Sequence, residues 1–125
     1  MAVASKGEVD VVLGGVERRL SLKIGDLEEI EARLNLGIGS LIDRFMKSYR
    51  LTDVRTVLQV ALEKSVRDQQ WTRESVLEMI KVEGPVAHAR TCARLLVAAL
   101  EPLPGGNPPK PDGEKEAQAS RSGVT

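Results

Sequence analysis

GEVDVVLGGVERRLSL, residues 7–22, has the alternating pattern of a β-hairpin, whereas the later patterns in the chain are helical. Glycine adopts positive φ at both central positions of a tight turn, so Gly14-Gly15 predicts a two-residue turn. Such a turn places Asp10 opposite Arg19 and Val9 opposite Leu20, which makes one face of the hairpin apolar and the other charged. A two-stranded ribbon is marginal alone, so we expect the helices that follow to cover its apolar face. The alternating apolar residues are Val9, Val11 and Leu13 before the turn and Leu20, Leu22 and Ile24 after it.

Composition indicates a single domain with a substantial core. The chain has 125 residues, of which 42% are hydrophobic, and its 18 basic and 18 acidic residues give no net charge. This balance argues against a general polyanion binder, because phosphate binding depends largely on excess basic charge. The longest strongly apolar run, residues 95–100, is far too short to cross a membrane. We therefore expect no nucleic-acid and no membrane partner.

Five helices are predicted from their starting signals and apolar periods. Asp26, Ser40, Thr52 and Thr72 are candidate caps for the first four, and Gly84-Pro85 separates the fourth from the fifth. Trp71 and Val76 have the spacing of a hydrophobic staple around Thr72. The fold class predicted is therefore α+β, an N-terminal hairpin followed by about five helices in a compact bundle. The buried stripe expected on the fifth helix is Val86, Ala89, Ala93, Leu96, Val97 and Leu100.

The domain boundaries follow from changes in composition. Residues 1–6 are expected to form a flexible N-terminus, and residues 7–101 the hairpin and helical domain. The segment from Pro102 to Thr125 contains five of the six prolines and few large apolar residues. Such a composition cannot bury enough surface to offset the entropy of ordering, which predicts a disordered tail over 102–125.

Catalytic and metal sites are not indicated by the sequence. His88 and Cys92 are the only histidine and the only cysteine, and they stand one helical turn apart. A Cys–His pair can form a nucleophile, but no orienting carboxylate stands at helical spacing beside this one. Two such residues are also too few to hold zinc. We expect a core cysteine, a boundary histidine, no cofactor, no metal and no enzymatic activity. A single cysteine also permits no internal disulfide, which fits a reducing cytoplasm.

An alternative function is DNA binding by a helix-turn-helix motif in residues 74–96. Two predicted helices joined at Gly84 have roughly the required length, and His88, Arg90 and Arg94 are candidates to face a groove. Helical hairpins of this kind are common in helical domains. The zero net charge and the acidic residues of the first helix argue against this function.

Several stretches in order resemble the tail assembly chaperones of gene transfer agents and related long-tailed phages. They are residues 7–34, GIGSLIDRFM, LTDVRTVLQVALE, TRESVLEMIKVEG and CARLLVAAL, and together they cover roughly residues 7–101. The resemblance implies a protein made in the host bacterial cytoplasm that coats the tape measure protein and helps tail tube subunits to polymerise around it. Its partners would be the tape measure protein, the tail tube protein and further copies of itself. A structural tail component retained in the particle is the alternative within this family.

Interaction residues are predicted from large apolar side chains and from the hairpin, whose outer edges carry unpaired backbone groups. The apolar side chains on helices that fill a partner groove are the same kind that fill a core, and both uses stay open here. The candidates for protein interaction are Val9, Val11, Phe45, Met46, Tyr49 and Trp71.

Overall fold

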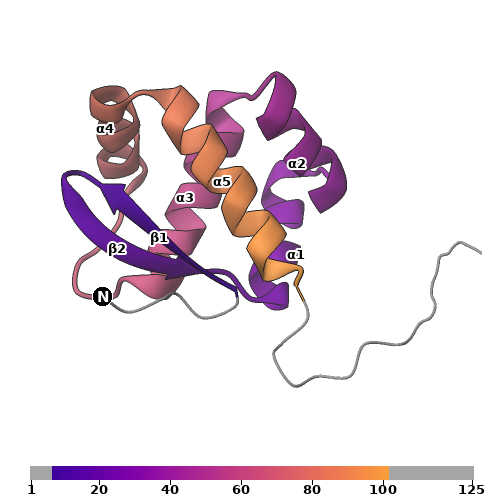
Figure 1. Cartoon of the computed structure of the whole chain (residues 1–125), viewed down its shortest axis with the longest axis horizontal. Coiled ribbons are helices and arrows are strands. Elements are labelled where there is room, and N and C mark those ends of the chain that lie inside the picture. The colour runs from indigo at the N-terminus through magenta and orange to yellow at the C-terminus, as the bar shows by residue number, and fades with distance from the viewer. Residues whose placement is uncertain (1–6, 102–125) are drawn as a thin grey trace, which may run out of the picture.

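The computed structural model describes residues 7–101, so the expectations for residues 1–6 and 102–125 lie outside the described residues. It confirms an α+β fold in which a hairpin precedes a bundle of helices (Figure 1). The strands are β1 (Glu8–Leu13) and β2 (Val16–Ser21). The helices are α1 (Ile24–Leu34), α2 (Ile38–Lys47), α3 (Leu51–Ser65), α4 (Arg73–Glu83) and α5 (Pro85–Ala99).

The hairpin has the predicted register. The strands are antiparallel, and Val9 pairs with Leu20 while Asp10 pairs with Arg19. Gly14 and Gly15 have φ angles of 61° and 78°, the positive values that a tight hairpin turn of this kind requires. Val9, Val11, Leu13 and Leu20 are buried, so the apolar face is covered as expected.

The inner face of the hairpin is not wholly apolar. Arg18 lies opposite Val11 and so belongs to the same face of the sheet. Its guanidinium carbon stands 5.3 Å from the centre of the Trp71 ring, a cation–π distance. Trp71 in turn donates a hydrogen bond from its indole nitrogen to the carbonyl of Val66 at 2.9 Å. A basic side chain is accommodated on the inner face because an aromatic ring receives it.

The core is organised around α3 and α5. Helix α3 contacts α1, α4, α5 and β2, while α5 contacts α2, α3 and β1. A helix surrounded on several sides is apolar around most of its circumference. Val60, which lies off the main apolar stripe of its helix, is accordingly fully buried with Val57 and Leu58. Within residues 7–101, no helix is long and apolar enough to span a membrane.

Three predicted helix caps are wrong. Helix α1 begins at Ile24, and Asp26 lies inside its first turn, where its carboxylate accepts a hydrogen bond from the backbone N–H of Lys23 at 2.8 Å. Ser40 lies within α2 and Thr52 within α3. The start of α2 is satisfied by a distant residue instead, because Glu31 accepts from the backbone N–H of Ile38 at 2.9 Å. Local capping signals do not reveal a carboxylate supplied by another helix.

The start of α4 and the junction with α5 agree with the predictions. The hydroxyl of Thr72 accepts a hydrogen bond from the backbone N–H of Ser75 at 3.0 Å, which caps α4. Gly84 ends α4 with φ 94° and ψ 135°, a conformation that L side chains rarely adopt, and Pro85 is the first residue of α5. A single glycine thus both ends one helix and begins the next.

Candidate interaction surface

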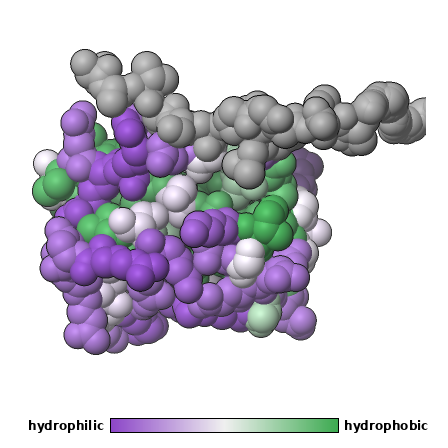
Figure 2. Space-filling view, turned by 90° about the horizontal axis from the view of Figure 1, so that it is seen from below, coloured by the Kyte–Doolittle hydropathy of each residue, from purple (hydrophilic) through white to green (hydrophobic). Residues whose placement is uncertain are grey.

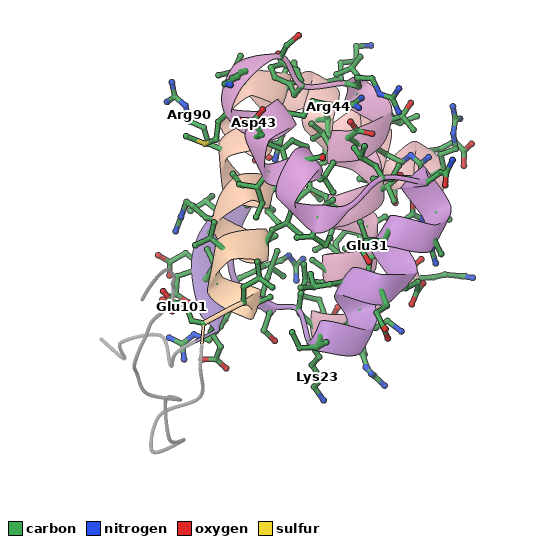
Figure 3. All side chains as sticks on the ribbon, turned by 90° about the vertical axis from the view of Figure 1, so that its right-hand side faces the viewer. Lys23, Glu31, Asp43, Arg44, Arg90 and Glu101 are labelled. Carbon is green, nitrogen blue, oxygen red and sulfur yellow. The ribbon has the colours of Figure 1, made fainter. Side chains whose placement is uncertain are left out.

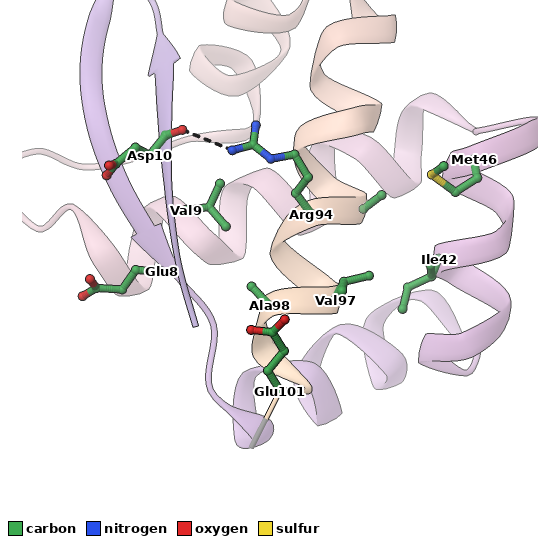
Figure 4. Close-up of a pocket in the computed structure, with 10 residues that line it drawn as sticks. Glu8, Val9, Asp10, Ile42, Met46, Arg94, Val97, Ala98 and Glu101 are labelled. Atoms are coloured by element: carbon green, nitrogen blue, oxygen red, sulfur yellow. Dashed lines mark hydrogen bonds between the residues drawn. The ribbon is translucent and has the colours of Figure 1, made fainter. Parts of the chain in front are cut away.

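A shallow groove of about 540 Å³ lies between β1 and α2, with α5 as its floor (Figure 4). Three elements far apart in the sequence form it because α5 packs against both β1 and α2. Apolar side chains line the centre, and charged ones stand on the β1 side and at the C-terminal end of α5. The lining residues are Glu8, Val9, Asp10, Ile42, Met46, Ala93, Arg94, Val97, Ala98 and Glu101.

The floor of the groove corrects the buried stripe expected for α5. Ala89, Ala93 and Leu96 are buried as expected, whereas Val86, Val97 and Leu100 keep 52%, 47% and 52% of their surface exposed. The rest of the buried face consists of His88, Cys92 and Leu95. The periodicity therefore predicted an apolar helix and half of its buried face, but the buried face is turned toward Cys92 and away from Val97. Because α3 covers the side of Cys92, the side that carries Val97 faces solvent.

The β1 side of the groove is an edge of the sheet. In a hairpin with a two-residue turn, Leu13 bonds to β2, so by alternation the backbone groups of Asp10 and Val12 point away from β2. The guanidinium of Arg94 donates a hydrogen bond to the carbonyl of Asp10 at 3.4 Å, which fits this direction (Figure 4). Helix α5 therefore partly satisfies the strand edge with a side chain.

A charged pair on the outer face stabilises this strand. Nε of Arg19 donates to Oδ1 of Asp10 at 2.8 Å, across the two strands. This hydrogen bond is the main reason why the pKa of the Asp10 carboxyl lies below its ordinary value. Desolvation opposes it in part, and the positive charge of the guanidinium adds a smaller lowering effect. The edge strand therefore presents an ionised carboxylate beside the groove at neutral pH.

A second recess continues the groove around the C-terminal end of α5. It shares Glu8, Ala98 and Glu101 with the first and extends to Ile24 and Leu100. Ile24 is 60% exposed, which is high for a large apolar side chain. Figure 2 shows this end of the molecule, where apolar patches lie between hydrophilic residues. A surface of this mixed kind suits binding to another protein.

The predicted interaction residues fall into two groups in the structure. Phe45, Trp71, Val9 and Val11 are buried in the core of the chain, and Tyr49 is partly buried against it. Met46 is 69% exposed and lines the groove. The part of all six residues in binding stays a prediction. Of the six, the exposed Met46 is placed to contact a partner directly.

Sequence reasoning missed Val97, Ile42 and Glu101 as groove residues. The apolar period of α5 includes Val97, but that signal does not distinguish a core position from an exposed one. The groove exists only where β1, α2 and α5 meet, and nothing local to any one of these segments indicates their meeting.

His88 and Cys92 have separate surroundings. The thiol of Cys92 is fully buried, contacts the carbonyl of Val54 at 3.6 Å, and has its pKa raised by that burial. His88 is also buried, not at the boundary as expected, and its Nε2 lies 2.9 Å from Oε1 of Glu83. A carboxylate thus stands beside the histidine after all, supplied by the end of α4 five residues earlier. Within residues 7–101, no group of three or more His, Cys, Asp or Glu residues is placed to hold a metal ion.

The candidate recognition helix is the central α5. Its buried residues face the core on one side, and Arg94 contacts the backbone of β1. Arg90 is exposed on the same helix. A recognition helix needs a free face that enters the major groove, whereas the exposed side of α5 is flanked here by β1 and α2.

These features define a small α+β protein with a surface groove suited to protein binding. Residues 6–102 match the family described as phage tail tube protein, GTA-gp10, and the chain belongs to this family. The predicted relation to the tails of gene transfer agents and phages is therefore confirmed, although the match is not specifically to tail assembly chaperones. No curated protein and no solved structure matches the chain.

Proposed function

We propose that this chain is a non-enzymatic structural component of a phage-like tail that is retained in the particle. The observation that carries the proposal is the match of residues 6–102 to a tail tube family. A structural component works through contacts with neighbouring subunits, and the groove between β1 and α2 offers an open surface for them. Before assembly the protein would reside in the host bacterial cytoplasm.

A tail assembly chaperone is the second candidate function. The partly apolar groove, with the flexible side chain of Met46 on one wall, suits a helical client such as the tape measure protein. A chaperone of this kind would promote polymerisation of the tail tube protein and leave before the particle is complete. A DNA-binding regulator is less well supported, because α5 is flanked by other elements and the chain has no net charge.

Quantitative mass spectrometry of purified particles and of assembling lysates separates the two candidates. A structural component should be present in purified particles in a fixed ratio to the other tail proteins. A chaperone should be abundant in lysates and absent from particles. The structural proposal would be wrong if this chain were absent from particles and formed a soluble complex when co-expressed with the tape measure protein. That result would favour the chaperone.

The groove is tested by two matched substitutions of exposed valines. Val97→Asp places a charge on the floor of the groove, whereas Val82→Asp places one on α4, at a side chain that is 72% exposed. If the groove binds a tail partner, the first substitution should abolish particle assembly and the second should not. Equal effects of both variants would show that the groove is not the surface in use.

A further inference from the structure

The charges around the groove between β1 and α2 are mostly negative. Glu8 and Asp10 line its β1 side, and Glu101 lines it beyond the end of α5. Arg94 is the one basic residue in the lining, and its guanidinium already donates to the Asp10 carbonyl. The Arg19 guanidinium, on the outer face of the hairpin, lies 2.8 Å from a carboxylate oxygen of Asp10 and 3.9 Å from one of Glu8. Even with Arg19 included, three carboxylates stand against two guanidiniums, so the groove has an excess of negative charge.

The C-terminus of α5 adds to this negative potential. The last carbonyl groups of a helix carry a partial negative charge, which a basic residue in the last turn can offset. Helices α1, α2, α3 and α4 each have a basic residue there, whereas α5 has none. Lys23 lines the adjoining recess, but within residues 7–101 no basic group forms an ion pair with Glu101. Arg90 lies toward the opposite end of α5 from Glu101 (Figure 3). The end of the groove at Glu101 should therefore attract a cation.

The exposed apolar residues of the groove lie on its other wall and on its floor. Ile42 and Met46 stand one helical turn apart on α2, and Val97 and Ala98 form the accessible part of the floor. Figure 4 shows Ile42 and Met46 across α5 from the β1 side. A complementary partner therefore has an apolar face beside α2 and positive charge beside β1 and the end of α5.

The edge of β1 favours a helix over an added strand as the occupant. A strand that pairs with this edge needs the Asp10 carbonyl, to which Arg94 already donates a hydrogen bond. A helix satisfies its own backbone groups, so it can bind through side chains alone and leave that bond in place. The small side chains of Val97 and Ala98 on the floor allow a helix to approach closely.

We propose that this groove binds an amphipathic helix of a neighbouring tail protein, with its apolar face against α2 and α5 and its basic residues toward β1 and Glu101. The inference deepens the proposed function, on which it rests for the tail partner, because it names the kind of segment that the groove accepts. Burial of Met46 and Val97 supplies the apolar contact. The carboxylates supply specificity, since a helix with an acidic face would place like charges opposite them.

Two synthetic peptides test the preference for a basic partner. Each is an amphipathic sequence of about 14 residues, a length at which isolated helices begin to form, with the same leucine face. One has lysine on its polar face and the other has glutamate. Binding to the isotope-labelled full chain is followed by NMR at low ionic strength, because salt screens exposed charges.

The lysine peptide should shift the amide signals of Asp10, Met46 and Val97 and leave that of Val82, on α4, unchanged. The glutamate peptide should bind at least about tenfold more weakly, because its charges oppose those of the groove. Both dissociation constants come from the same titrations.

Two reversals of exposed carboxylates locate the site. Glu101→Lys reverses a charge at the end of the groove, whereas Glu78→Lys reverses one on α4, outside the groove, and changes the net charge equally. The first should weaken binding of the lysine peptide at least about threefold, and the second should leave its dissociation constant within about twofold of the wild-type value. The NMR spectrum of each free variant verifies that it is folded.

The proposal would be overturned if the lysine peptide did not bind or shifted signals outside the groove alone. Equal affinity for the two peptides, or equal effects of the two reversals, would also overturn it. These outcomes are separate from the tail role. A chain present in particles but without preference for the lysine peptide keeps the tail role and loses this inference. A chain absent from particles that still prefers this peptide does the reverse.

Discussion

Oε1 of Glu83 lies 2.9 Å from Nε2 of the buried His88, within ion-pair distance although without the geometry of a hydrogen bond. The other carboxylate oxygen of Glu83 accepts a hydrogen bond from the backbone N–H of Gly14 at 2.6 Å. The last residue of α4 therefore links the tip of the hairpin to α5. The same carboxylate also lies 3.4 Å from the backbone nitrogen of Gly15.

Removal of the Glu83 carboxylate should destabilise the protein. Glu83→Ala leaves the turn amides without their acceptor and should lower the free energy of unfolding by about 2 kcal/mol. Glu83→Gln retains an amide oxygen as acceptor and should cost about 1 kcal/mol. Urea denaturation followed by circular dichroism measures both. Equal losses in the two variants would show that the acceptor oxygen is not what stabilises the turn.

Asp53 should be the most sensitive acidic residue of α3. It is fully buried, and its two carboxylate oxygens lie 3.6 Å from Arg44 and 3.3 Å from Arg50. Asp53→Ala should lower the free energy of unfolding by about 2 kcal/mol, because buried bonds to charged groups are lost. Arg50→Ala should cost only about 0.5 kcal/mol, since that side chain is largely exposed. Chemical denaturation measures the loss of unfolding free energy in both variants. A larger loss in Arg50→Ala than in Asp53→Ala would contradict the prediction.

Two glycine substitutions should act in opposite directions. A Cβ added at Gly84 or at Gly39 meets no atom within 4 Å, so neither substitution causes a clash. Gly84 has a φ of 94°, and Gly84→Ala should cost about 1–3 kcal/mol through backbone strain. Gly39 lies within α2, and Gly39→Ala should stabilise the protein by about 0.5–1 kcal/mol. Thermal melting should therefore shift downward for the first variant and upward for the second.

The thiol of Cys92 should be inert in the folded protein. Burial raises its pKa, and the thiolate is the reactive form. We expect reaction with Ellman's reagent at pH 8 to be at least about a hundredfold slower than for the protein in guanidinium chloride. An exposed thiol introduced by Val82→Cys is the matched control and should react rapidly. Rapid labelling of Cys92 itself would mean that α5 opens readily from the core.

The pair of Asp10 and Arg19 should make the hairpin sensitive to acid. Because the pKa of Asp10 is lowered in the folded state, its stabilising effect is complete above the ordinary value of 3.8 and is lost as the pH falls through the folded value. Carbon-detected NMR should place the Asp10 titration below 3.8. In Arg19→Gln the titration should move up toward the ordinary value. A midpoint that does not change between the two proteins would exclude Arg19 as the cause.

The hairpin and the helices were predictable because their signals are local. The alternation around Gly14-Gly15 specified the register, and Thr72 and Gly84-Pro85 marked helix boundaries, since the residues that shape these features lie beside one another. Caps at Asp26, Ser40 and Thr52 were misplaced. Of these helices, α2 shows the clearest reason, because Glu31 reaches its first turn from α1.

The groove was not predictable from the sequence, because it too depends on elements that are far apart in the chain. Val97 and Leu95 are both apolar and both lie on α5, yet one is half exposed and the other fully buried. Which side of a helix faces solvent depends on where its neighbours pack. Met46 was predicted for interaction and is exposed, whereas Phe45, one residue earlier, is in the core.

The hairpin is fastened at both ends. Ser65 of α3 accepts from the backbone N–H of Ser21 at 3.0 Å and donates to its carbonyl at 3.1 Å, at the open end, while Glu83 holds the turn. A ribbon clamped in this way cannot peel from the helices one residue at a time. Its slowest amide protons should therefore exchange with deuterium only when the whole domain unfolds, which makes the hairpin part of a single cooperative folding unit.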